Sequence, residues 1–221
     1  MTVSRIAFCL LSFVVAVAGC QPDAPGGRGP NAGGGSATAT RAARNAERCD
    51  AATTSVVVDS VGIGPVLRGT RIADLASRCP VTDTALAPAE GTPERAHVVT
   101  VRGHPIVVLS TGTPDTSIIR VMTVDPAFKT TGGVGVGSSV QALRLAHGRI
   151  CAARGEGGFV VMASELPGVS FAIDWSPPPS RDPSVADTPF PGGDPGTALD
   201  ATRIVRLWVH GVSGACRVGV G

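Results

Sequence analysis

Residues 69–75 read GTRIADL, and residues 137–143 read GSSVQAL. Both segments follow the pattern Gly-[Ser/Thr]-x-[Ile/Val]-x-x-Leu, which is typical of a turn that leads into a short amphipathic helix. A second pair of matched segments follows in the same order, IIRVM at residues 118–122 and IVRLW at residues 204–208. Two matches in the same order predict an internal duplication.

Runs rich in β-branched residues follow each expected helix and predict strands. In the first unit these runs lie at residues 98–101, 106–109 and 118–124, and in the second at 159–162, 169–173 and 204–209. We therefore expect an α+β fold of two tandem modules, each a short helix followed by an antiparallel three-stranded meander. Because one short helix covers little of a sheet, the two modules should share one core or one sheet. Module 1 then spans residues 47–127, and module 2 spans residues 128–221 with a Pro/Gly-rich surface loop at 176–200.

The first residues of the chain predict an export signal. Arg5 precedes an apolar run from Ile6 to Ala18, which is too short to span a bilayer as a helix. The run ends in VAGC at residues 17–20, which resembles the lipobox of bacterial lipoproteins. The resemblance implies removal of residues 1–19 and lipidation of Cys20. The alternative is an ordinary secretory signal with a chance cysteine.

The segment after the signal predicts a flexible connection to the membrane. Residues 20–46 join the lipidated cysteine to a stretch rich in Gly, Pro and Ala, which cannot bury apolar surface and is typical of a tether. Gln21 follows the cysteine, at the position where aspartate retains enteric lipoproteins in the inner membrane. The resemblance therefore implies an outer-membrane lipoprotein whose lipid-anchored domain faces the periplasm.

The charge balance excludes some classes of partner. Lys+Arg total 19 and Asp+Glu total 17, a formal net charge of +2, which argues against a nucleic-acid binder. The glycine-rich turn at residues 131–139 precedes a helix but lacks the lysine of a phosphate-binding P-loop. A repeated structural turn explains it better, and we expect no cofactor.

The cysteines predict disulfides. Four of them lie in the exported domain: Cys49, Cys79, Cys151 and Cys216. An even number in this setting favours two bonds. We prefer the pairs Cys49–Cys79 and Cys151–Cys216, which respect the duplication, although four cysteines allow two other arrangements. The spacing of cysteine and histidine matches no metal site, so none is expected.

The polar residues indicate binding more than catalysis. The chain has four histidines outside any recognised catalytic motif: His97, His104, His147 and His210. We therefore expect no enzymatic activity, and the chief alternative is a hydrolase whose site combines distant residues such as His104 and Asp174. Arg120 and Arg206 occupy equivalent positions in the matched strands. They either blunt a strand edge or, if they share one face, bind an acidic partner.

Short motifs at residues 62–64, 117–121 and 207–208 are similar to those of the sigma-E-regulated envelope lipoproteins of Gram-negative bacteria, which carry a domain of unknown function. The resemblance covers about residues 55–210 and supplies no catalytic residues. It implies an envelope lipoprotein with a non-catalytic periplasmic domain that binds or supports another envelope protein. A third alternative is a secreted-type inhibitor module that uses the loop at 176–200.

Overall fold

The computed structural model describes residues 41–86, 94–112, 116–155, 158–176, 190 and 193–211. Its helices are short: residues 41–46, α2 (Ile72–Ala76) and α3 (Val140–His147). The strands are β1 (Val57–Asp59), β2 (Gly62–Ile63), β3 (Val66–Leu67), β4 (Val81–Leu86), β5 (Glu94–Val101), β6 (His104–Ser110), β7 (Ile118–Thr123), β8 (Lys129–Thr130), β9 (Ile150–Gly155), β10 (Gly158–Ala163), β11 (Val169–Ile173) and β12 (Ile204–Val209).

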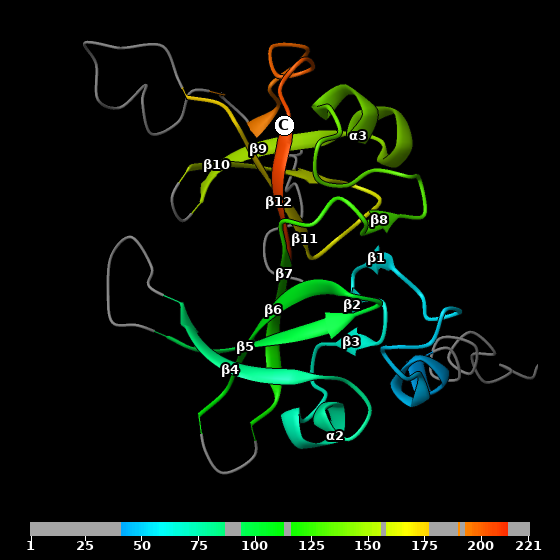
Figure 1. Cartoon of the computed structure of the whole chain (residues 1–221). Coiled ribbons are helices and arrows are strands. Elements are labelled where there is room, and N and C mark those ends of the chain that lie inside the picture. Colours follow the sequence, from blue (N-terminus) through cyan, green and yellow to red (C-terminus); the bar gives the residue numbers. More distant parts are fainter. Residues whose placement is uncertain are drawn as a thin grey trace, which may run out of the picture.

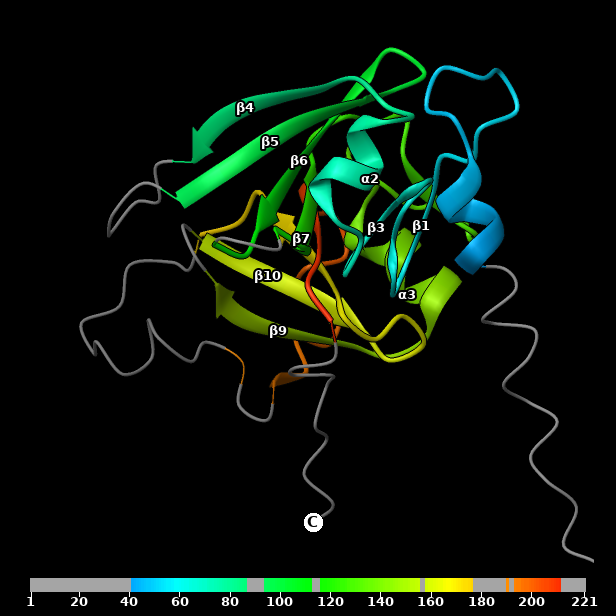
Figure 2. The ribbon, with the colours of Figure 1, turned by 90° about the horizontal axis from the view of Figure 1, so that it is seen from below.

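The main element is an eight-stranded sheet in the order β4-β5-β6-β7-β12-β11-β10-β9 (Figure 1). Its strands β4 to β7 come from the first half of the chain and β9 to β12 from the second. Each group pairs in chain order, and β7 meets β12 at the centre. The sheet curves, so that β4 and β5 lie on the opposite side of the molecule from β9 and β10 (Figure 2).

A second, small sheet has the order β3-β2-β1-β8. Parallel pairing of β1 with β8 joins residue 57 to residue 129 and so links the two halves of the chain. Gly62 is needed within this sheet because a Cβ there would lie 2.2 Å from the carbonyl oxygen of Val66. The short strands therefore depend on a close approach of two backbones.

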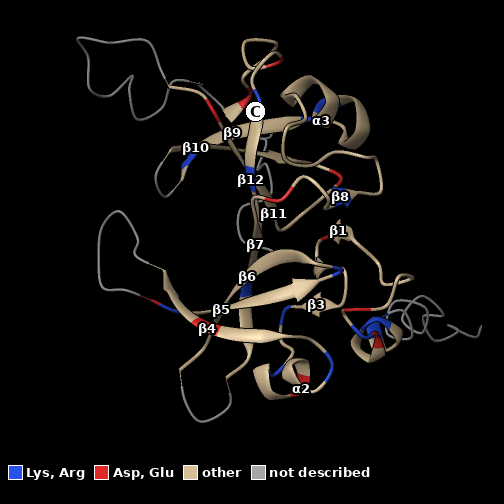
Figure 3. Ribbon diagram, in the orientation of Figure 1, with Lys and Arg blue, Asp and Glu red and all other residues tan. Residues whose placement is uncertain are grey.

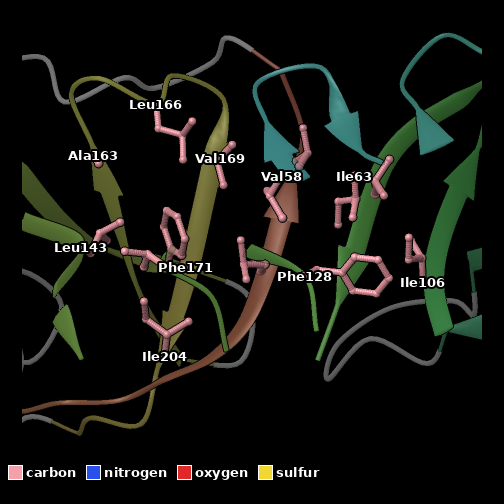
Figure 4. Close-up of a cluster of buried hydrophobic side chains, with 14 of the residues drawn as sticks. Val58, Ile63, Ile106, Phe128, Leu143, Ala163, Leu166, Val169, Phe171 and Ile204 are labelled. Atoms are coloured by element: carbon pink, nitrogen blue, oxygen red, sulfur yellow. The ribbon is translucent and has the colours of Figure 1, made fainter. Parts of the chain in front are cut away.

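One hydrophobic core lies between these elements (Figure 4). The small sheet contributes Val58, the residue just before β8 is Phe128, α3 contributes Leu143, and the large sheet contributes Phe171, all with no more than 1% of their surface exposed. Because helices and strands from both halves bury their apolar side chains together, the halves form one packed body.

The matched sequence segments make the same backbone contacts in both halves. The amide of Gly69 donates to the carbonyl of Ile118 at 2.7 Å, and the amide of Gly137 donates to the carbonyl of Ile204 at 2.8 Å. Each bond fastens the turn before a helix to the start of a central strand. The first sequence match is therefore hydrogen-bonded to the second within each half.

The two helices that follow these turns begin differently. In α3 the N-cap is Ser139, whose hydroxyl accepts from the amide of Ala142 at 3.2 Å. In α2 the N-cap is Arg71, which makes no side-chain cap. Gly148 ends α3 with a φ of 75°, a left-handed conformation that glycine adopts without strain.

The expected α+β fold of two modules, each a helix followed by a three-stranded meander, is wrong. The chain is mostly β, and four strands rather than three follow each of α2 and α3. The additional strands, β4 and β9, are the two edges of the large sheet, and four of the six residues of β4 are polar or small. Edge strands need little apolar surface, so their sequences lacked the hydrophobic signal.

The expected tether at residues 20–46 is too long at its C-terminal end. Residues 41–46 are helical, and only 9% of Arg44 is exposed. The Nε of Arg44 donates to the carbonyl of Gly64 at 2.8 Å, and its guanidinium also pairs with Asp59. Charged and polar groups anchor this segment to the domain, so its sequence carries no apolar pattern that would predict a packed helix.

Candidate functional site

The cysteine pairing is confirmed for the first half of the chain. Cys49 and Cys79 form a disulfide, and both are buried in the core cluster. Cys151 is also disulfide-bonded, whereas Cys216 lies outside the described residues, so the Cys151–Cys216 pair stays a prediction. The expected lipidation site, Cys20, lies outside the described residues as well.

Strand register places the two matched arginines on one face of the large sheet. Trp208 pairs with Met122, while Val209 pairs with Val121 in the core. Because side chains alternate along a strand, Arg206 and Arg120 lie on the same face as Trp208 and Met122. Along the strand direction the two arginines lie four residues apart, which corresponds to about 13 Å.

An aromatic ring and an imidazole lie beside the two arginines. The guanidinium carbon of Arg206 lies 5.5 Å from the centroid of the Trp208 ring, within the range of a cation–π contact. Nε2 of His210 lies 2.7 Å from the hydroxyl oxygen of Ser170, within hydrogen-bonding distance. Burial lowers the pKa of His210, and the nearby charges of Arg120 and Arg68 lower it further. His210 is therefore neutral at pH 7.

Exposed apolar side chains stand beside both arginines. Ile119 precedes Arg120 and is 46% exposed, and Val205 precedes Arg206 and is 42% exposed. Over the whole ribbon, basic and acidic positions are scattered and neither half holds one sign alone (Figure 3). We call Ile119, Arg120, Val205, Arg206 and Trp208 the central seam, because they lie where β7 meets β12.

The chain itself occupies the amides at the start of α3, which follow the glycine-rich turn. The amide of Val140 donates to the carbonyl of Thr202 at 3.0 Å, and that of Gln141 to the carbonyl of Asp200 at 3.1 Å. The next amide, of Ala142, donates to the Ser139 hydroxyl. These three N–H groups therefore serve the fold and are not available to an anion.

The suggested pairing of His104 with Asp174 does not form. Nδ1 of His104 lies 2.9 Å from a carboxylate oxygen of Asp125 instead. In the sheet, β6 is separated from β11 by β7 and β12, three strand spacings of about 4.8 Å each. Burial raises the pKa of Asp125, whereas hydrogen bonds from the Ala127 amide and from His104 lower it. The pKa of Asp125 is lowered on balance.

His147 has a structural role at the end of α3. Its Nε2 lies 2.6 Å from the hydroxyl of Thr130, and only 5% of the residue is exposed. Burial lowers the pKa of His147, partly offset by the charge of Glu165. The histidine therefore joins α3 to β8 as a neutral hydrogen-bonding group.

The structure also brings together three residues that the sequence did not single out as a group. On the core side of the large sheet, Nδ1 of His97 lies 2.8 Å from a carboxylate oxygen of Asp83, and its Nε2 lies 3.2 Å from the hydroxyl of Ser110. The three come from the adjacent strands β4, β5 and β6. The only signal in the sequence was a polar residue at an inward position of each strand, which could be read only once the register was known.

No group of three or more His, Cys, Asp or Glu residues suited to a metal ion occurs among the described residues, and no described helix is long and apolar enough to cross a membrane. The end of the Pro/Gly-rich loop at 193–200 is part of the fold, since Leu199 is fully buried and Asp200 pairs with Arg144 at 3.1 Å. Residues 177–189 lie outside the described part of the chain.

No family model matches the chain, and no curated protein matches its sequence. Among solved structures, the crystal structure of the uncharacterized protein yfeY from Escherichia coli is similar, with a TM-score of 0.49 and 14% sequence identity. The match covers 70% of this chain and 99% of that chain. A likeness this distant carries no inference about the site.

Proposed function

We propose that this chain is an outer-membrane lipoprotein of the sigma-E-regulated kind, anchored by acylated Cys20, whose periplasmic domain binds an acidic envelope protein. The binding surface is the central seam. One observation carries this proposal: on both central strands an exposed β-branched residue is followed by an arginine, and the two arginines share one face.

The composition of the seam suits a protein partner. Covering exposed apolar side chains stabilises a complex, by about 25 cal/mol for each Å² of apolar surface removed from water. Arginine and tryptophan are the residues most often found at the energetic centre of such interfaces. Two arginines about 13 Å apart can each meet a carboxylate of an acidic partner and so fix its orientation.

Charge reversal tests the proposal directly. The variant Arg120→Glu/Arg206→Glu should lose a partner that cross-links to the wild-type chain in intact envelopes, because two attractive contacts become repulsive. The matched control is Arg102→Glu/Arg149→Glu, which makes the same change in net charge at two exposed arginines outside the seam. The proposal is wrong if both double variants retain the same cross-linked partners.

The lipid anchor is tested separately. Cys20→Ala should remove labelling by a palmitate analogue and release the chain from the membrane fraction, because no acyl chain can then be attached. Cys9→Ala should change neither, since Cys9 lies in the expected signal. Retained labelling in Cys20→Ala would contradict the lipoprotein assignment.

A further inference from the structure

Asp83, His97 and Ser110 form a continuous hydrogen-bonded chain from a carboxylate through an imidazole to a hydroxyl. The chemistry of each group fixes the proton positions. A carboxylate only accepts, so Nδ1 of His97 must donate to Asp83. In the neutral imidazole Nε2 then accepts, and the donor to it is the Ser110 hydroxyl.

We propose that these three residues form a nucleophilic site. Ser110 attacks small carboxylic esters, His97 is the general base and Asp83 positions the imidazole. A nucleophile and a base within about 2.6–3.2 Å, with the base oriented by a third group, define such a site irrespective of fold. This activity goes beyond binding at the central seam. It differs from the expectation, drawn from the sequence, that the protein has no enzymatic activity.

Exposure places the site where a small substrate can enter. His97 is only 4% exposed, whereas Ser110 is half-buried and the Asp83 side chain, on the edge strand β4, is 75% exposed. The imidazole is therefore enclosed, while Ser110 is partly exposed and the Asp83 carboxylate reaches solvent. A buried base beside a half-buried serine suits attack on a compact acyl group.

The reaction balances without any added cofactor. The Ser110 oxygen bonds to the carbonyl carbon of the ester as its proton passes to Nε2 of His97. The bond to the leaving alkoxide then breaks, and that oxygen takes the proton from His97. Water attacks the acyl-Ser110 by the same route, releasing the carboxylic acid and restoring the hydroxyl. The sum is ester plus water to acid plus alcohol.

A second hydroxyl–imidazole pair in the same molecule provides an internal control. Ser170 and His210 lie 2.7 Å apart, but no carboxylate contact to His210 is found among the described residues. Ser170 is also only 5% exposed. If a short hydroxyl–imidazole contact were sufficient for reactivity, Ser170 would react as readily as Ser110.

The test uses the purified full chain in detergent and a fluorophosphonate probe, in which the serine oxygen displaces fluoride from phosphorus. We expect labelling at Ser110 by peptide mapping, and turnover of p-nitrophenyl acetate above buffer. Ser110→Ala should abolish both, and Ser170→Ala should leave both unchanged. Labelling at Ser170, or equal labelling and turnover in Ser110→Ala and wild type, would overturn the proposal, as would the absence of any labelling.

Variants of His97 and Asp83 test the roles of these residues in the reaction, and urea unfolding shows whether the variants remain folded. His97→Gln should slow labelling by about 100-fold or more, the usual contribution of a general base. Asp83→Asn should slow it by only about 10-fold, because an exposed carboxylate is screened by water. The urea midpoints of Asp83→Asn and Ser110→Ala should match that of the wild type. Unchanged labelling in Asp83→Asn would assign that residue no positioning role, and if His97→Gln does not fold, the other two variants decide the proposal.

Discussion

The first half of the large sheet holds a polar chain at positions where the second half holds core residues. Asp83 is the third residue of β4 and pairs with His97, and Ser110 follows two residues after the partner of His97. The corresponding positions of the second half, found by the same register in β9, β10 and β11, are Ala152, Val161 and Ile173. All three of these lie in the core cluster.

The comparison separates what the fold requires from what it tolerates. The second half shows that apolar side chains at these positions pack well. The first half uses three of them for groups that contribute less to packing and need partners when buried. Such a departure from the local rule is expected at a functional site rather than in a core built only for stability. The comparison therefore agrees with a chemical role for the hydrogen-bonded residues Asp83, His97 and Ser110.

The disulfide of the first half should give the largest effect on stability. Cys49→Ser/Cys79→Ser removes a link across a sequence separation of 30 residues. The restricted entropy of the unfolded chain predicts a loss of about 3–4 kcal/mol. Urea unfolding of the double variant measures it. A loss below about 1 kcal/mol would mean that the segment around Cys49 packs firmly without the bond.

Exchanging residues between the two halves tests the comparison itself. Val161→His places an imidazole without partners in the core and should cost about 2–3 kcal/mol. His97→Val should cost less than about 1 kcal/mol, because the exposed Asp83 and the half-buried Ser110 can both be hydrated. Thermal and urea unfolding of each single variant provide the measurement. If His97→Val is the more damaging exchange, the polar chain supports the fold and the comparison fails.

The two helices should respond unequally to changes at their N-caps. Ser139→Ala removes the hydroxyl that accepts from the Ala142 amide in the first turn of α3. The free energy of unfolding should fall by about 1 kcal/mol. Arg71 occupies the same position of α2 without a side-chain cap, so Arg71→Ala should lose no capping energy. Equal losses in the two variants, measured by urea unfolding, would show that capping does not distinguish the helices.

Acid should destabilise the protein through His147, and this is the smallest of the expected effects. Burial lowers its pKa in the folded state below the ordinary value of 6.5. As pH falls below about 6.5 the unfolded chain binds protons first, so stability decreases. The loss between pH 7 and pH 6 is at most about 0.7 kcal/mol for one histidine. His147→Gln should reduce this pH dependence of the unfolding free energy, and an unchanged pH profile would contradict it.

Sequence patterns predicted the central strands, because residues 118–122 and 204–208 are rich in β-branched side chains and apolar except for one arginine each. They did not predict β4, a polar edge strand, or the helix at residues 41–46, which is held by Arg44. The pair Cys49–Cys79 was predictable because the duplication limited the choices. The chain Asp83–His97–Ser110 was not, because it depends on the pairing of β4, β5 and β6.

The sequence by itself therefore determined the local elements: where turns end in helices, which strands are buried, and which cysteines are available for pairing. These follow from periodicity and residue type over a few neighbouring positions. Only the tertiary structure decided which side chains meet. A shift of one residue in the pairing of β5 would turn His97 to the other face of the sheet. Register depends on the whole packed sheet, and so the candidate sites could be found only there.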